Sequence, residues 1–311
     1  MMTSEELNAH IADGSINEVI RVAEARQVKH LSRIADEVSA NGACRLVLVT
    51  GASAAGKTTT AKRICTQLLV NGAPAALHLS TDDYFVGDEL NPRDENGNLD
   101  YEHVECVDIA RLASDINALL LGESVPRRRF DFVRHAPFHT NEFITLPAGG
   151  MIVLEGIHAL NPRLTEGIDD AMKFRVFIEP QADLDVFGGG VGPTPAEARF
   201  LRRLVRDNQF RKRNPVDTFR MWPSVIAGEK KWIEPFRGNA DATFNSYLVY
   251  ELAALKFYVG GLVARAQREL GDDPQIRAMI RLLLTVNPIS PEAIPGDSIL
   301  RETIGGSQLE Y

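Results

Sequence analysis

The stretch CRLVLVTGASAAGKTTT, residues 44–60, joins an apolar run to a glycine-containing loop and a series of threonines. Its first part, residues 44–50, is rich in Val and Leu, which is typical of a strand buried on both faces. The next part, residues 51–58, reads GASAAGKT and matches the phosphate-binding pattern G-x-x-x-x-G-K-[ST]. A strand before this pattern and a helix after it predict that the segment binds the phosphates of a nucleotide.

The residue types of this loop suit ATP and magnesium. Glycine lets backbone N–H groups close around phosphate oxygens, and the amino terminus of the following helix favours negative charge. Lys57 is expected to reach the β- and γ-phosphates, and Thr58 to ligate Mg²⁺ through its hydroxyl. A glycine-rich turn that binds nothing is the alternative, and the flanking strand and helix disfavour it. The expected ATP-binding residues of the loop are Gly51, Ala52, Ser53, Ala54, Ala55, Gly56, Lys57, Thr58 and Thr59.

Strand and helix patterns alternate along the rest of the chain. Short apolar runs typical of strands recur at residues 75–79, 151–154, 174–178 and 241–244. Helical patterns follow at residues 57–69, 107–121, 196–211 and 249–270. This alternation predicts an α/β fold of the P-loop NTPase type, in which a doubly wound parallel sheet is flanked by helices.

The composition narrows the class of protein. The 311 residues are 44% hydrophobic and 24% charged, with a formal net charge of −8. The acidic balance argues against a nucleic-acid coat, and no apolar run approaches the roughly 18 residues of a membrane span. Three cysteines are too few for a disulfide framework. We therefore expect a soluble, cytoplasmic protein that binds neither nucleic acid nor membrane, with homo-oligomer formation left open.

Acidic residues follow two of the expected strands. Asp82 and Asp83 come after LHLST, and Glu155 comes after MIVL. In open α/β sheets ligands bind at the carboxyl ends of the strands. One carboxylate of the Asp pair is expected to accept the proton of an acceptor hydroxyl, and Glu155 to hold Mg²⁺ directly or through water. Capping of a helix or turn is the alternative for both sites.

Four arginines share one face of the helix expected at residues 196–211. Their spacing of three and four residues puts them in a stripe, which suits a helical lid that closes over transferring phosphates. A solvated face paired with Glu197 and Asp207 is the alternative. The four are Arg199, Arg202, Arg203 and Arg206.

Five further motifs accompany the loop along the chain. They are STDDYF at residues 80–85, LDYEH at 99–103, FDFVRH at 130–135, LEGIH at 154–158 and RRLVRD at 202–207. In this order and spacing they resemble the uridine kinase and phosphoribulokinase family of P-loop kinases. The stretch MWPSV at 221–225, with the tail SILRE at 298–302 and GGS at 305–307, is similar to the bacterial uridine kinase-like branch without its TGS-type domain.

The resemblance implies a role for each matching residue. Asp82 would be the catalytic base, with Lys57 and Arg202 as further catalytic residues. Arg199, Arg203 and Arg206 would contact ATP, and Thr58 and Glu155 would hold Mg²⁺. Glu102 stands where the family has Asp, and Arg134 where animal uridine kinases have a small polar residue. The implied acceptor-binding residues are Asp82, Tyr84, Tyr101, Glu102, Phe130, Arg134 and His135.

The resemblance also sets the expected domains and function. Residues 1–42 are expected to form a helical extension, residues 43–270 a P-loop kinase domain with a lid at about 196–235, and residues 271–311 a tail packed on the core. The implied activity is the ATP- and Mg²⁺-dependent phosphorylation of a nucleoside 5′-hydroxyl. A kinase of another hydroxyl, such as a sugar phosphate or pantothenate, and a nucleotide-binding regulator with little turnover are the alternatives.

Overall fold

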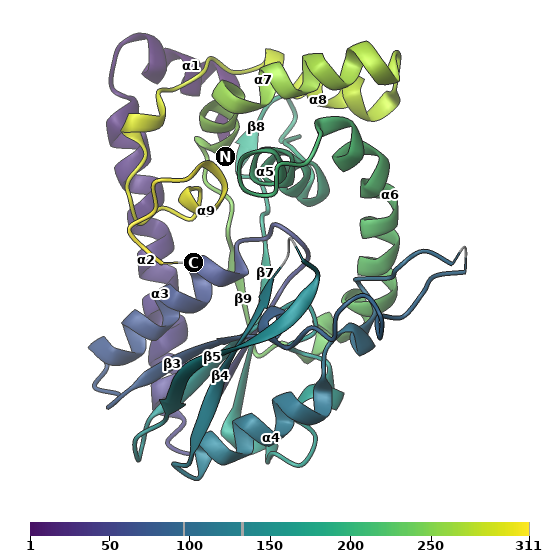
Figure 1. Ribbon diagram of the computed structural model, residues 1–311. Coiled ribbons are helices and arrows are strands. Elements are labelled where there is room, and N and C mark those ends of the chain that lie inside the picture. Colours follow the sequence, from purple (N-terminus) through teal and green to yellow (C-terminus); the bar gives the residue numbers. More distant parts are fainter. Residues whose placement is uncertain (96, 132–133, 311) are drawn as a thin grey trace.

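The centre of the molecule is a five-stranded parallel sheet (Figure 1), seen in a computed structural model that describes residues 1–95, 97–131 and 134–310. In spatial order the strands are β3 (Ala76–Ser80), β6 (Met151–Glu155), β2 (Leu46–Thr50), β7 (Lys173–Glu179) and β9 (Ala242–Asn245). All four neighbouring pairs run parallel. The predicted α/β fold with a parallel sheet is confirmed.

Strand β2 lies in the middle of the sheet and is buried along its whole length. Its side chains alternate between the two faces, as the pleat of a strand requires. Leu46 and Leu48 belong to the apolar cluster on one face, and Val47 and Val49 to the cluster on the other. This double burial explains why the sequence is a continuous apolar run rather than an alternating one.

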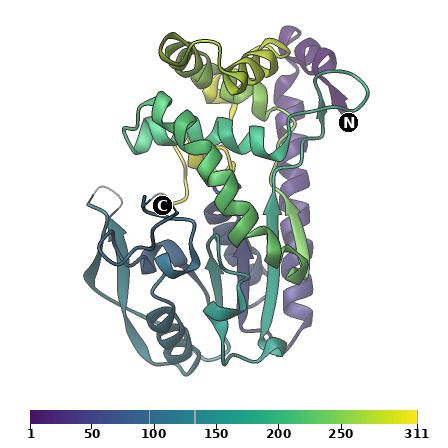
Figure 2. The same ribbon diagram turned by 90° about the vertical axis from the view of Figure 1, so that its right-hand side faces the viewer.

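Helices cover both faces of the sheet (Figure 2). Helices α2 (Ile16–Ala40) and α3 (Lys57–Val70) pack together and bury Ile34 and Ile64 in the cluster that contains Val47. Helix α4 (Ile109–Leu120) buries Leu112 in the cluster of the opposite face. The phosphate-binding loop is therefore held between a buried strand and a helix that is itself packed on both sides.

The amino-terminal region, expected as one helical extension, consists of two helices. Helix α1 (Ser4–Ala12) ends before Gly14, which has a φ of +82°. The long helix α2 then runs beside α3 and contributes to the main core, so the region is packed into the domain. A two-residue strand, β1 (Met2–Thr3), pairs in parallel with β8 (Leu184–Asp185).

A second group of helices stands over the carboxyl edge of the sheet, at the top of Figure 1. It comprises α5 (Pro195–Phe210), α6 (Pro215–Trp232), α7 (Glu251–Leu270), α8 (Pro274–Leu284) and α9 (Arg301–Ile304). Helices α5 and α6 cover most of the expected lid, and they bury Phe200 and Trp222 in the same core as α7. In this structure the expected lid is thus packed against the domain.

An antiparallel hairpin, β4 (Ser124–Asp131) with β5 (Ala136–Thr145), stands beside the sheet. No strand was expected in this segment, because arginines and other polar residues interrupt any apolar run. Short 3₁₀ helices link the main elements: η1 (Thr81–Tyr84), η2 (Val104–Cys106), η3 (Pro162–Thr165), η4 (Asp170–Met172), η5 (Glu234–Asn239) and η6 (Pro291–Ala293). Among the described residues, no helix combines the length and apolarity needed to cross a membrane.

Candidate active site

The phosphate-binding loop leaves the carboxyl end of β2 and enters α3, at the sheet edge where α/β folds bind ligands. Two positive backbone angles shape it, a φ of 62° at Ala54 and of 90° at Gly56. Helix α5 braces the loop from outside. Arg203 donates to Oγ of Ser53 at 2.8 Å, and Arg199 donates to the Ser53 carbonyl at 3.3 Å.

The sheet register brings Thr58 and Glu155 together. Strands β3 and β6 end side by side, with Ser80 paired to Glu155, so the residues after β3 lie next to Glu155. The hydroxyl of Thr58, at the start of α3, donates to Oε1 of Glu155 at 3.1 Å. Two residues expected to hold magnesium, 97 positions apart in the sequence, therefore meet at one point.

The environment of Glu155 favours its protonated form in the absence of a cation. Burial, followed by the negative charge of Asp82, raises the pKa of Glu155 to about 7, while the nearby charge of Lys57 opposes the rise. His78 lies with Nε2 4.0 Å from the same carboxylate, and burial lowers the pKa of this histidine to about 4, which leaves its ring neutral at pH 7. A bound cation would supply the compensating charge that Glu155 lacks.

The oxygen ligands present suit Mg²⁺ completed by phosphates and water. Within the described residues, no three His, Cys, Asp or Glu side chains form a ready-made metal site. Mg²⁺ in nucleotide-binding proteins commonly uses one or two protein oxygens together with substrate phosphates. The Thr58 hydroxyl and the Glu155 carboxylate fit that arrangement.

Lys57 is the first residue of α3, and its side chain folds back over the loop. Its ammonium donates to the Ala52 carbonyl at 3.3 Å. The charge of Lys57 is also close enough to Glu155 to oppose the rise in the pKa of that carboxyl. A lysine in this position can bridge the outer phosphates of a bound nucleotide.

Asp82 and Asp83 follow β3 in η1, and only Asp83 has an ion-pair partner among the described residues. Arg129 approaches Oδ2 of Asp83 at 3.1 Å, while burial raises the pKa of that carboxyl. Both aspartates line a cavity beside Glu155. The unpaired Asp82 is therefore the better placed of the two to accept a proton.

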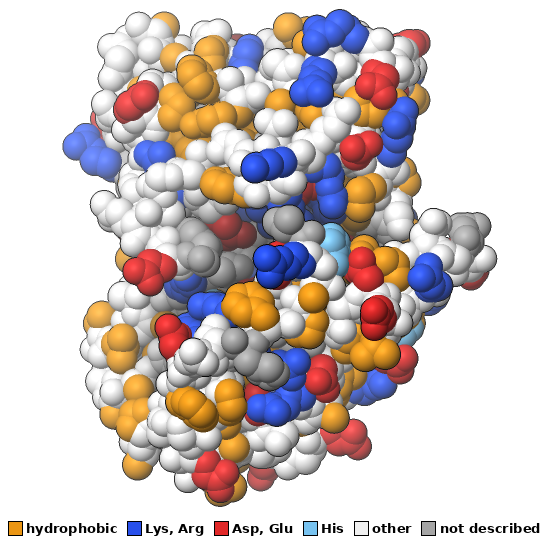
Figure 3. Space-filling view, viewed as in Figure 1, with side chains coloured by type: hydrophobic (Ala, Val, Ile, Leu, Met, Phe, Trp, Pro, Cys, Tyr) orange, Lys and Arg blue, Asp and Glu red, His pale blue; other side chains and the backbone are white. Residues whose placement is uncertain are grey.

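The cavity has a volume of about 660 Å³ and lies between the start of α3, the β4–β5 hairpin, α5 and the carboxyl-terminal tail. Basic side chains are prominent in its wall, and Figure 3 shows Lys and Arg gathered across the middle of this face. They are Lys62, Arg127, Arg128, Arg129, Arg206, Arg211 and Arg301. The acidic side chains of the wall are Asp82, Asp83, Glu155, Glu302 and Glu310.

Arg202, expected as a catalytic residue, lies behind the loop. Its guanidinium makes a bidentate ion pair with Glu251, with both contacts at 2.6 Å. It also donates to the carbonyls of Ala55 at 3.1 Å and Ser246 at 2.8 Å. The side chains of Arg202 and Glu251 are 3% and 1% exposed, so this arginine joins the loop to α7 instead of facing the cavity.

The other three arginines of the stripe differ in their surroundings. Arg199 pairs with Glu229 of α6 at 2.6 Å, and Arg203 lies 3.3 Å from Asp207 of its own helix. Arg206 faces the cavity, with Glu302 at 3.8 Å. Arg203 thus has Asp207 as its partner, but both side chains are buried, so the solvated face considered as the alternative is not found there. Glu197 closes a capping box with Thr194.

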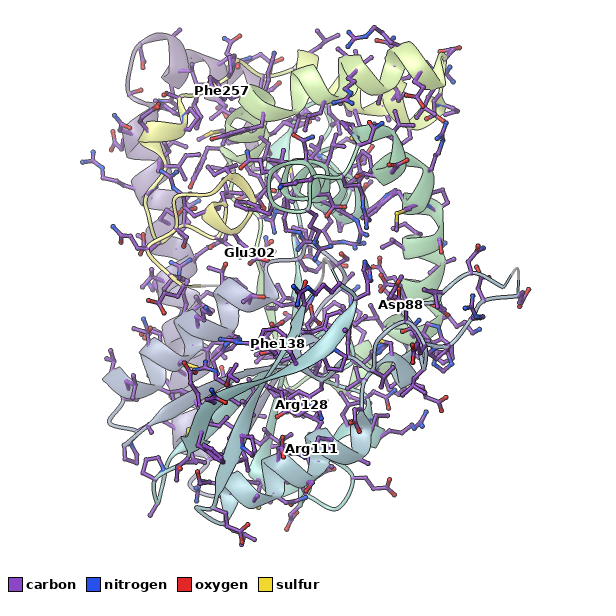
Figure 4. The ribbon with its side chains drawn as sticks, in the orientation of Figure 1. Asp88, Arg111, Arg128, Phe138, Phe257 and Glu302 are labelled. Atoms are coloured by element: carbon purple, nitrogen blue, oxygen red, sulfur yellow. The ribbon has the colours of Figure 1, made fainter. Side chains whose placement is uncertain are left out.

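Two expected acceptor-binding residues, Tyr101 and His135, lie together outside the cavity wall. Their ring centroids are 5.7 Å apart, and the Tyr101 hydroxyl is 3.2 Å from Nδ1 of His135. That hydroxyl also donates to Asp88 at 2.7 Å. Asp88 is labelled in Figure 4 near the α6 side of the molecule.

The remaining expected acceptor residues are scattered. Glu102 is half-buried against Gly228 of α6, with its Oε2 atom buried, and burial raises the pKa of its carboxyl. Tyr84 lines the cavity with its ring, while its hydroxyl donates to Asp115 at 3.1 Å. Phe130 packs against Phe85, with the ring centroids 5.5 Å apart.

Arg134 lies on the surface. Its side chain is 85% exposed, with Nε 3.7 Å from Asp131. Phe132 and Val133, which belong to the same motif, lie outside the described residues.

Several residues of the cavity wall were not expected there from the sequence. Arg128 and Arg129 belong to β4, which carries both into the wall of the cavity. His78 and Lys62 gave no signal, because a single polar residue in a strand or helix is usual. Glu302 was seen only as part of a tail motif, and its place beside the loop depends on a contact across the whole chain.

Comparison with known proteins identifies the family of this chain. The family model of the phosphoribulokinase / uridine kinase family matches residues 46–253. A uridine kinase of Deinococcus deserti is 29% identical over 62% of this chain and 83% of its own length, and one of Halobacterium salinarum is 28% identical over 62% and 76%. A solved structure of a possible uridine kinase from Bacillus stearothermophilus is 19% identical, covers 65% of this chain and 89% of its own, and has a TM-score of 0.40. With its P-loop, its parallel sheet and this match over most of its length, the chain belongs to the phosphoribulokinase / uridine kinase family.

Proposed function

We propose that this kinase transfers the γ-phosphate of ATP to the 5′-hydroxyl of a nucleoside, in a reaction that requires Mg²⁺. The observation that carries the proposal is the arrangement of four residues at the mouth of the loop. Lys57 lies over the loop, Thr58 touches Glu155, and Asp82 stands beside Glu155 at the cavity wall. Phosphoryl transfer needs these elements: a phosphate cradle, a metal-binding pair and a base for the hydroxyl.

In the proposed mechanism Asp82 accepts the proton of the attacking hydroxyl. Its carboxylate has no ion pair among the described residues, and it lies in the wall of a cavity large enough for a small acceptor. Lys57 would draw the outer phosphates toward the loop and neutralise charge as the bond to the leaving oxygen loosens. Thr58 and Glu155 would hold Mg²⁺, which would supply positive charge to offset the negative charge of the phosphates.

Helix α5 supports the loop in this mechanism in two ways. Arg203 and Arg199 hold Ser53 from outside, and Arg202 anchors the loop backbone to Glu251. Arg206 is the member of the stripe that faces the cavity, so it is the arginine we assign to phosphate contact. Preorganised positive charge of this kind stabilises the charge that develops during transfer.

A nucleoside acceptor is supported by the relatives named uridine kinase, which match most of the P-loop domain. It is supported also by the pairing of Tyr101 and His135, which offer ring faces and polar edges at one place. A flat base could stack against such rings. Glu102 follows Tyr101 in the sequence and lies against Gly228 of α6. Its carboxylate would accept hydrogen bonds from the ribose hydroxyls.

A second candidate acceptor is anionic, and the basic wall of the cavity favours it. The positive charge of Arg206 is the main cause that lowers the pKa of Arg211 to about 10. Positive charge is therefore concentrated in this part of the cavity wall. Arg127 of the hairpin adds to it, with its partner Glu142 67% exposed. A sugar phosphate or a carboxylate would pair with such guanidinium groups.

The test is ADP release by the purified protein with ATP, Mg²⁺ and a panel of acceptors that includes uridine, cytidine, sugar phosphates and pantothenate. We expect turnover with the pyrimidine nucleosides, and loss of turnover in Lys57→Ala with the fold retained by circular dichroism. Turnover only with a phosphorylated or carboxylated acceptor would support the second candidate instead. Full turnover in Lys57→Ala, or none with any acceptor, would contradict a kinase at this loop.

A further inference from the structure

The carboxyl-terminal tail returns to the phosphate-binding loop and is fixed there. Ser298, with its side chain buried, lies with Oγ 3.3 Å from the Tyr250 hydroxyl, and Leu300 is fully buried. The side chain of Ile299 lies directly against Gly56, so that a Cβ at this glycine would collide with it. The tail therefore packs on the outer side of the loop, where only a glycine leaves room.

Glu302 extends from this anchored segment to the start of α3. Its Oε2 accepts a hydrogen bond from the Thr59 hydroxyl at 2.8 Å and one from the Thr59 backbone N–H at 3.4 Å. Figure 4 shows Glu302 above α3, at the centre of the molecule. Thr59 is the third residue of α3, and the N–H groups of a first helical turn have no acceptor within their own helix.

A carboxylate of the chain itself thus occupies donors that the loop would offer to a nucleotide. Phosphate and carboxylate oxygens both bind the amino terminus of a helix, because its N–H groups and dipole favour negative charge. The Glu302 side chain is only 15% exposed, and its nearest cation is Arg206 at 3.8 Å. A polyphosphate that arrived at Thr59 would meet a like charge in a poorly solvated place, where repulsion is strong.

We infer that Glu302 competes with the nucleotide for Thr59, so that the tail stabilises the empty loop and lowers its affinity for nucleotide. The inference rests on the proposed binding of a nucleotide at this loop. It makes Glu302 a positioning residue with two opposite effects: its hydrogen bonds to Thr59 cap α3 in the free protein, and its charge must leave Thr59 before a phosphate can bind.

The decisive variant is Glu302→Gln, which keeps the shape of the side chain and removes its charge. We expect the variant to bind ADP about tenfold more tightly than the natural chain, measured by isothermal titration calorimetry without acceptor. We also expect a lower melting temperature without nucleotide, because a neutral amide is a weaker partner for the helix terminus. A residue with a merely structural role would lower stability and affinity together.

The matched control is Glu292→Gln, which removes the same charge from an exposed position of the tail, in η6. This control should leave ADP affinity unchanged. If the natural chain does not bind ADP, the proposed function fails. If the natural chain binds ADP and Glu302→Gln binds it equally or more weakly, the competition is refuted while the proposed function stands.

If Glu302→Gln does not fold, the competition is tested by hydrogen exchange on the natural chain. Displacement of Glu302 should loosen α9, whose amides bond to Leu300 and Arg301. Amide hydrogen exchange at residues 301–306 should then become faster when ADP binds. Exchange that is unchanged or slower with ADP would overturn the inference.

Discussion

Replacing Arg202 by Met tests whether this arginine acts on the substrate or holds the loop. Its guanidinium is buried with Glu251, at 2.6 Å for both contacts, and it holds the loop backbone through the Ala55 carbonyl. Removing one partner of a buried ion pair leaves the other charge uncompensated, which costs about 3–5 kcal/mol. We expect Arg202→Met to lower the free energy of unfolding by about that amount, measured by urea denaturation.

Two further variants make the measurement specific. Arg206→Met removes an arginine from the same helix, but its side chain is 18% exposed and its partner lies 3.8 Å away, so the stability should fall by about 1 kcal/mol or less. The double variant Arg202→Met, Glu251→Leu removes both buried charges and should recover most of the lost stability. The kcat of the kinase should fall in Arg206→Met, since this residue faces the cavity.

One pattern of results would contradict the claim that Arg202 holds the loop and does not act on the substrate. If Arg202→Met unfolds at the urea concentration of the natural chain and yet loses kcat by a hundredfold or more, Arg202 acts in the transition state. The bidentate pair with Glu251 would then not describe the catalytic form of the enzyme.

Two other predictions concern the carboxylates of the site. Asp82→Asn should lower kcat by about two to four orders of magnitude, because the general base is lost. Asp83→Asn removes only the partner of Arg129 and should lower kcat less. Steady-state kinetics that rank the two variants in the opposite order would make Asp83 the base. The pKa of Glu155, raised to about 7, means that protons compete with Mg²⁺ below that pH, so Mg²⁺-dependent nucleotide binding should weaken by about tenfold per pH unit as the pH falls below 7. In Glu155→Gln the pH dependence should disappear along with most of the Mg²⁺ effect, and a slope that persists in a titration of this variant would point to another group.

Much of the fold followed from local patterns. The run LVLVT at residues 46–50 and the loop after it could be predicted, because a doubly buried strand must be apolar and a phosphate-binding loop needs glycine turns. The hairpin at 124–145 was missed because its arginines interrupt the strand pattern, and the structure holds it through strand pairing and through contacts of β4 with η1 and α4.

The sequence by itself predicted the parallel sheet, the phosphate-binding loop and the acidic residues at the strand ends, since the carboxyl ends of parallel strands lie at one edge of the sheet. Only the tertiary structure decided which arginine of α5 is buried and which faces the cavity, and it alone placed Glu302 on Thr59. These contacts join residues 49 and 243 positions apart. Sequence spacing identifies only partners on the same helix, such as Arg203 and Asp207, so the pairing of Arg202 and of Glu302 depends on how helices α5, α7 and α9 pack around the loop.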